Sequence, residues 1–118
     1  MEKNTLVRGA VYERDFIDLL ADIASVLPIA HTVFSEEQKL PYAIWNESSG
    51  DFIFADGNIV RGYVDIVLEV YTATNDTVAV SEIERILKKH KKLYNFDSMY
   101  IEKEKCKMTV FEFTVRKD

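Results

Sequence analysis

Residues 60–72 constrain the fold more than any other part of the chain. They read Val-Arg-Gly-Tyr-Val-Asp-Ile-Val-Leu-Glu-Val-Tyr-Thr and alternate between two faces with the period-two pattern of a β-strand. One face carries Val64, Ile66, Leu68 and Val70, and the opposite face carries Tyr63, Asp65, Val67, Glu69 and Tyr71. Because this is the longest strand-like run in the sequence, we expect it to lie centrally in a sheet.

Further strand-like segments occur on both sides of this run. Asp56-Gly57 precedes it, and Asp-Gly between apolar runs is a strong hairpin signal, because a type I′ turn needs two residues that tolerate positive φ. The sequence predicts additional strands at 29–34, 42–47, 51–55, 98–103 and 106–116. Ser48-Ser49-Gly50 is predicted to be a loop, and a tight turn should join the last two strands.

Two segments have the period of an amphipathic helix. In residues 12–27 the apolar side chains at helical spacing are Phe16, Leu19, Leu20, Ile23 and Leu27, and Pro28 ends the helix. The second helix should run from about residue 77 to 91 after the polar segment 74–76, which offers an N-cap. Its inward positions are Val80, Ile83, Ile86 and Leu87.

This order of elements predicts one α+β domain spanning residues 1–118. We expect two layers, a mainly antiparallel sheet with both helices packed on one face. A chain of 118 residues can bury one modest core without metals or disulfides. Residues 1–11 carry little pattern, so we expect a flexible or docking arm there.

Composition excludes several classes of protein. The net charge of −5 argues against a general nucleic-acid binder, which needs a basic surface. The single cysteine, Cys106, rules out an internal disulfide and indicates a reducing compartment. No signal peptide and no membrane-spanning apolar run of ~20 residues is evident, so we expect the protein to stay in a cytoplasm or in a particle assembled there.

The sequence carries no catalytic or metal-binding motif. His31 and His90 lie far apart without metal ligands at useful spacing, and Cys106 has no partner histidine, although Lys105 and Lys107 could lower its pKa. Residues 51–58 fail as a calcium loop because position 53 is an isoleucine. Asp65 and Glu69 share a strand face with apolar residues and do not resemble a buried acid–base pair. We therefore expect no catalytic residues, no metal and no cofactor.

One basic run follows the second helix. It consists of Lys88, Lys89, Lys91 and Lys92 around His90. Positive charge at a helix C-terminus offsets the helix dipole, so a solvated helix end is the favoured interpretation. A weak phosphate contact is the alternative.

Several short stretches resemble, in order and spacing, a known group of proteins. They are residues 30–34 (AHTVF), 40–45 (LPYAIW), 52–56 (FIFAD), 67–72 (VLEVYT), 81–87 (SEIERIL) and 100–102 (YIE). The likeness as a whole covers roughly residues 12 to 115. The chain resembles small proteins encoded among the head–tail genes of long-tailed bacteriophages and prophages of Gram-positive bacteria. These are regarded as tail completion, tail terminator or head–tail joining proteins.

The resemblance implies a structural protein of the virion, made in the host bacterial cytoplasm. Such proteins are small α+β domains that form a ring, commonly a hexamer, between the tail tube and the head connector. The resemblance thus implies the chain itself, the connector and the tube protein as partners, with no substrate and no cofactor. DNA would pass through the ring without being read, and an acidic protein suits that task because negative walls do not grip DNA.

Two other functional classes stay open. A small interaction or regulatory ligand-binding domain would show a pocket lined by convergent polar groups. A nucleic-acid-processing accessory protein would use the lysine run and bind DNA in a salt-dependent manner.

The predicted hairpin suggests where copies of the chain meet. A two-residue turn places Ala55 opposite Asn58, Phe54 opposite Ile59 and Phe52 opposite Arg61, and opposed residues share a face. Ile53, Ala55 and Val60 then join the helix-covered face, while the second face carries Phe52, Phe54, Ile59, Arg61, Tyr63, Val67 and Tyr71. A face this aromatic predicts an interface between copies. Alternatively, the C-terminal hairpin or the arm covers it within one chain, or a register slip exchanges the faces.

Overall fold

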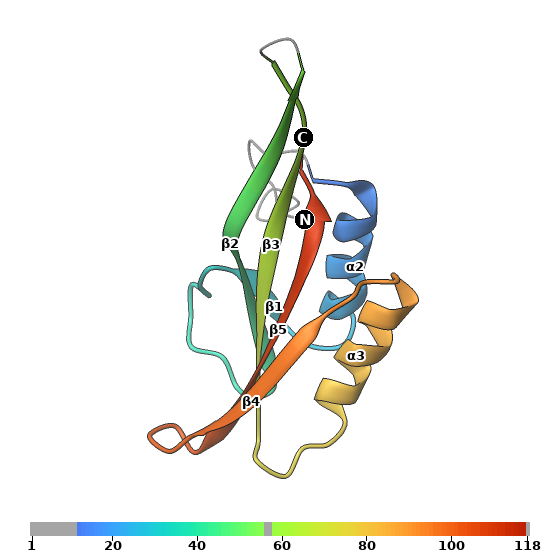
Figure 1. Ribbon diagram of the computed structural model, residues 1–118. Helices are drawn as coiled ribbons and strands as arrows, with labels where there is room; N and C mark the ends of the chain where they lie inside the picture. The colour runs from blue at the N-terminus through green and yellow to red at the C-terminus, as the bar shows by residue number, and fades with distance from the viewer. Residues whose placement is uncertain (1–11, 56–57, 118) are drawn as a thin grey trace.

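The computed structural model describes residues 12–55 and 58–117 (Figure 1). Within 51–55 and 58–61 it describes the backbone but not the side chains. Its elements are α2 (Arg14–Ala24), β1 (Ile29–His31), β2 (Tyr42–Ala55), β3 (Asn58–Thr72), α3 (Ala79–Lys89), β4 (Asn95–Ile101) and β5 (Cys106–Arg116). The expected arm at 1–11 and the expected turn at Asp56-Gly57 lie outside the described residues.

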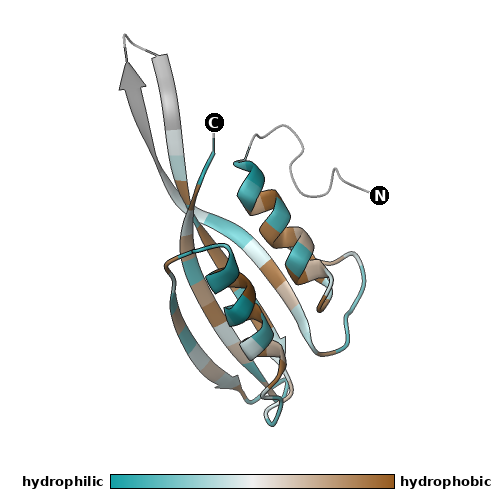
Figure 2. Cartoon of the chain, turned by 90° about the vertical axis from the view of Figure 1, so that its right-hand side faces the viewer, coloured by the Kyte–Doolittle hydropathy of each residue, from teal (hydrophilic) through white to brown (hydrophobic). Residues whose placement is uncertain are grey.

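The five strands form one sheet in the order β1-β2-β3-β5-β4. Only β1 and β2 are parallel, and the other three pairs are antiparallel. Both helices cover the same face of this sheet, as Figure 2 shows with the helices in front of the strands. The predicted α+β architecture and the central position of β3 are therefore confirmed.

The core lies between the two helices and the sheet. Alternate residues of β3 and β5 point into it, because side chains of a strand project to opposite faces in turn. Trp45 of β2 is completely buried, and its ring makes edge contacts with the rings of Tyr12 and Phe16 at centroid distances of 5.8 and 5.2 Å. The buried members on the strands and helices include Phe16, Leu19, Leu20, Ile23, Val64, Ile66, Leu68, Val70, Ile83, Leu87, Phe111, Phe113 and Val115.

Residues 48–50 are strand and not the predicted loop. β2 runs without a break from residue 42 to 55, and a bulge between Glu47 and Ser49 absorbs the extra residue. Ser49 pairs with Asp65 and donates a hydrogen bond of 2.8 Å to its carboxylate. Gly50 allows the close approach of β3, because an added Cβ would lie 2.9 Å from a methyl carbon of Val64. The two strands expected at 42–47 and 51–55 are thus one.

The predicted hairpin register is correct only near the turn. Ala55 pairs with Asn58 and Phe54 with Ile59, as predicted. The predicted pairing of Phe52 with Arg61 is wrong, since Phe52 pairs with Gly62 and Arg61 pairs with Ile53. An irregularity between Ile53 and Phe54 adds one residue to β3 and shifts the register beyond it.

Other boundaries differ from the predictions by a few residues. Both helices are shorter than expected. The N-cap residue of α3 is Val78 and not a residue of the segment 74–76, although the Asp76 carboxylate accepts hydrogen bonds from the backbone N–H groups of Val78 and Ala79 at 2.8 and 3.1 Å. β1 ends at His31 and not at 34, and β4 covers Asn95–Ile101 and not 98–103. β5 has the predicted bounds.

Two leucines test the position of the core. Leu19 is fully buried, whereas Leu93 is 93% exposed. We expect Leu19→Ala to lower the free energy of unfolding by about 2–5 kcal/mol, because it leaves a cavity. The same change at Leu93 should shift it by less than about 0.5 kcal/mol. Urea unfolding of both variants measures the difference, and equal losses would contradict this placement of the core.

Candidate functional site

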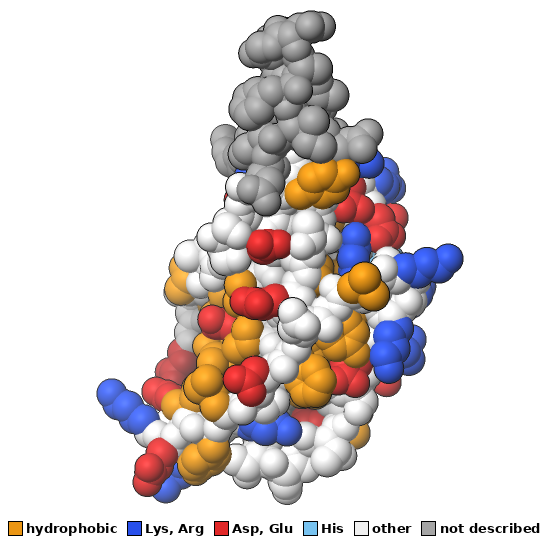
Figure 3. All heavy atoms as spheres, in the orientation of Figure 1, with side chains coloured by type: hydrophobic (Ala, Val, Ile, Leu, Met, Phe, Trp, Pro, Cys, Tyr) orange, Lys and Arg blue, Asp and Glu red, His pale blue; other side chains and the backbone are white. Residues whose placement is uncertain are grey.

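The face of the sheet away from the helices is the candidate site and is called the outer face. Its residues lie in five rows across the strands: Tyr42, Tyr71, Met108 and Met99; Ile44, Glu69, Val110 and Asp97; Asn46, Val67, Glu112 and Asn95; Ser49, Asp65 and Thr114; and Tyr63 and Arg116. None of these side chains is buried. Figure 3 shows hydrophobic and acidic side chains interspersed below the grey atoms.

Acidic and apolar residues alternate on this face. The described rows hold the carboxylates of Asp65, Glu69, Asp97 and Glu112, and their one basic residue is Arg116, at the end of the face beside Tyr63. Apolar side chains, including those of Val67 and Val110, lie between these carboxylates. A sheet face that met only water would be more uniformly polar. The pattern therefore favours contact with another macromolecule.

Hydrogen bonds and ring stacking hold several outer-face side chains in place. The rings of Tyr42 and Tyr71 stack with their centroids 4.9 Å apart, and the Tyr71 hydroxyl donates to Glu69 at 2.8 Å. Burial and the Glu69 carboxylate raise the pKa of Tyr71. Asp65 accepts hydrogen bonds from Thr114 at 2.7 Å and from Ser49, and these lower its pKa. Asp65 and Glu69 thus have separate partners and do not form a carboxylate pair.

The residues predicted for the interface divide into two groups. Tyr63, Val67 and Tyr71 lie half-buried on the outer side of β3. The other four, Phe52, Phe54, Ile59 and Arg61, belong to the segments whose side chains lie outside the description. The C-terminal hairpin does not cover this face, because β5 and β4 extend the sheet beside β3. The sequence pattern alone missed the contribution of β5, whose pairing partner is distant in the chain.

A pocket of about 450 Å³ lies where the β1–β2 connection folds over one end of the outer face. Its lining comprises residues of the connection together with Tyr42, Ile44, Glu104 and Cys106. The Cys106 side chain is buried. Its burial is the main cause that raises the pKa of the thiol, and the negative charge of Glu104 adds to the effect. The neighbouring lysines therefore do not lower this pKa, contrary to the possibility that the sequence raised.

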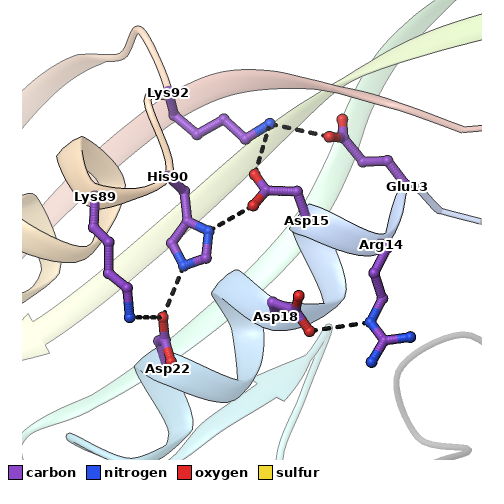
Figure 4. Close-up of polar contacts among 8 residues, drawn as sticks. All are labelled: Glu13, Arg14, Asp15, Asp18, Asp22, Lys89, His90 and Lys92. Atoms are coloured by element: carbon purple, nitrogen blue, oxygen red, sulfur yellow. Dashed lines mark hydrogen bonds and ion pairs between the residues drawn. The ribbon is translucent and has the colours of Figure 1, made fainter.

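A polar cluster joins the two helices on the other side of the molecule (Figure 4). The imidazole of His90 lies between Asp15 and Asp22, with nitrogen–oxygen distances of 2.8 and 2.7 Å, and its side chain is only 8% exposed. Burial works to lower the pKa of His90, but the hydrogen bonds and charges of the two carboxylates outweigh it and raise the pKa. His90 is thus a link between α2 and α3, a role that no local sequence signal indicated.

This cluster also accounts for half of the lysine run. Lys89 pairs with Asp22 at 3.1 Å, and Lys92 pairs with Glu13 at 3.3 Å. Lys88 and Lys91 are exposed. Two of the four lysines therefore bind carboxylates of the chain itself, which favours the interpretation of the run as a helix end.

The remaining candidates do not converge on one site. His31 stacks on the indole of Trp45 at a centroid distance of 4.0 Å, and burial lowers its pKa. Among the described residues, no group of three or more histidine, cysteine or acidic side chains is placed to hold a metal ion. Within that same part of the chain, no helix has the length and apolar character needed to cross a membrane.

Comparisons with known proteins identify no relative of this chain. The chain matches no protein-family model, and a search of curated proteins finds no similar sequence.

The histidine link predicts a pH-dependent stability. Because the pKa of His90 is raised on folding, its stabilising effect is complete below the ordinary histidine pKa of about 6.5 and is lost as the pH rises through the raised value. We expect the melting temperature of the wild type to fall relative to that of His90→Gln above that pH. Thermal melts between about pH 5.5 and pH 9 measure this, and a constant difference would contradict it.

The buried thiol predicts slow chemistry. A water-soluble aromatic disulfide reagent should react with Cys106 at least about 100-fold more slowly in the folded protein than in urea, because reaction needs an accessible thiolate. Cys106→Ser provides the blank. Equal rates would show that the pocket admits the reagent to an ionised thiol.

Proposed function

We propose that the protein is a structural component of the head–tail junction of a long-tailed bacteriophage or prophage, of the tail terminator or tail completion type. Copies form a ring, a hexamer in the particle, at the end of the tail tube, between that tube and the head connector. The ring acts on no substrate and binds no cofactor. The proposal rests on the ordered resemblance of six short stretches and on the outer face.

The outer face is the observation that carries the proposal furthest. It spans β2, β3, β5 and β4, so it is a broad surface and not a single strand. Apolar side chains supply the area that an interface buries, and acidic side chains around them keep the free subunit soluble. A ring also requires head-to-tail contact, in which the outer face of one copy meets a different surface of the next. The predicted pairing with Arg61 placed Phe52 in this contact. Because β2 and β3 instead pair Phe52 with Gly62, the contact is proposed only for the outer-face rows described above.

The small ligand-binding domain is the second candidate function. The pocket at the β1–β2 connection favours it, because Glu36, Glu37 and Glu104 line it together with apolar side chains. A ligand there would raise the melting temperature and protect Cys106 from thiol reagents. A ligand effect of this kind together with an absence of rings would favour the second function over the first.

Two valines of the outer face test the ring. Val67 and Val110 lie on neighbouring strands, and Val67→Asp with Val110→Asp should abolish rings by burying charge in the contact. Val78→Asp, at a valine that is 65% exposed beside α3, is the matched control and should leave rings intact. Electron microscopy and light scattering at high protein concentration measure assembly.

The outcomes separate interface from core. Thermal melts should show that the double variant stays folded, and an unfolded variant would place the two valines in the core. Rings that persist in the folded double variant would put the contact elsewhere. A wild type that forms no ring at any concentration would contradict the proposed function.

A further inference from the structure

The strand at one margin of the sheet is unusually exposed. β4 is the last strand in the order and pairs only with β5 in the part of the chain that the structure describes. Three of its large side chains, Phe96, Met99 and Tyr100, are exposed by 57, 49 and 56%. These residues lie along the edge at which another strand could add to the sheet.

The backbone of β4 offers hydrogen-bonding groups on its free side. Lys117 donates its backbone N–H to Gly62 of β3, whereas the Arg116 carbonyl faces the other way and accepts from Glu13. This alternation directs the backbone of Met108, Val110 and Glu112 toward β4, where they pair with Met99, Asp97 and Asn95. The backbone groups of Phe96, Ser98 and Tyr100 therefore point away from β5. The Ser98 N–H accordingly donates to the Asp97 carboxylate at 3.0 Å and not to a strand.

β4 lacks the features that usually protect a sheet edge. Natural edges are short, bulged or interrupted by lysine and proline. The opposite margin of this sheet has such features, because β1 has only three residues and β2 carries a bulge at Glu47 and Ser49. β4 has seven residues in regular register, without lysine or proline, and Asp97 is its single charge.

We propose that β4 pairs with β4 of a second copy of this chain, antiparallel and in a register centred on Ser98. The two sheets then continue into one another. Phe96, Ser98 and Tyr100 of each copy supply the backbone groups that form the new hydrogen bonds.

The sequence of β4 is self-complementary in this register, which is why a second copy is the occupant. Phe96 stands opposite Tyr100 of the other copy at both ends of the pair, and cross-strand aromatic pairs stabilise sheets. Asp97 stands opposite Met99, so the two like charges do not face each other. Phe96 already packs on Phe111 of its own β5, with ring centroids 5.9 Å apart, and the pairing extends this aromatic row.

This contact is independent of the proposed ring. A two-fold contact uses the same patch on both copies and closes on itself, so it joins two subunits and cannot build a ring alone. It also uses the margin of the sheet, whereas the ring uses the outer face. The test is therefore made in the Val67→Asp, Val110→Asp background, in which rings are absent.

Charge placement tests the register. In that background, sedimentation equilibrium over about a hundredfold range of concentration should detect a dimer. Phe96→Lys with Tyr100→Lys puts lysine opposite lysine and should weaken the dimer at least about tenfold. Phe96→Glu with Tyr100→Lys puts opposite charges at the same positions and should retain the dimer, more weakly as salt is added. A monomeric background protein, or equal effects of the two pairs, would overturn the proposal.

Proline tests the backbone. Ser98→Pro removes an N–H on the free side of β4 and keeps the backbone hydrogen bonds to β5. It also removes the hydrogen bond between the Ser98 and Thr109 hydroxyls, so we expect a folded monomer of lower stability. Ser98→Ala loses the same hydroxyl contact but keeps that N–H, and it should keep the dimer. Circular dichroism checks the fold, and a proline variant that remains folded and dimeric would overturn the proposal.

Discussion

Burial of one face of β3 is the interaction on which the rest of the structure depends. Val64, Ile66, Leu68 and Val70 are at most 4% exposed beneath the two helices. Each such side chain contributes about 1.5–3 kcal/mol when it leaves water. Both neighbouring strands add to the same layer, Trp45 from β2 and Phe111 from β5. Once this face is committed to the core, strand geometry sends every intervening residue to the outer face.

The outer-face residues do not pack into the core, so core packing does not explain why apolar and acidic side chains alternate there. The Tyr71 hydroxyl and the Asp65 carboxylate have partners within the face, so these groups are already oriented before any contact forms. Such a surface loses little conformational freedom on binding. The sheet edge at β4 differs from the outer face, because it offers unpaired backbone N–H and C=O groups and not mainly side chains. One sheet thus presents a face and an edge, and the contacts proposed for them depend on different physical interactions.

The sequence predicts the parts of this fold that depend on local pattern. Period-two alternation identified β3. The polar run before α3 contained Asp76, whose carboxylate binds the N–H groups of the N-cap residue Val78 and of the first helical residue Ala79. Ser48-Ser49-Gly50 was mispredicted because small polar residues occur both in loops and in bulged strands, and only the distant partner Asp65 decides between them. His90 was interpreted as a solvated helix end, since no local spacing reveals Asp15, which lies 75 residues away. The extension of the outer face onto β5 likewise depends on long-range pairing.

The position of β5 has a consequence for synthesis of the chain. β5 follows the other four strands in the chain but lies between β3 and β4, so the sheet stays in two parts until β5 has left the ribosome. The residue before α2 also depends on β5 for its contacts. Glu13 donates its backbone N–H to the Arg116 carbonyl, and its carboxylate accepts from the Arg116 N–H. Tyr12 and Lys117 form a further bridge between the first and last described residues. Folding during translation can therefore produce the β2–β3 hairpin early, but the sheet closes only after β5 has been made.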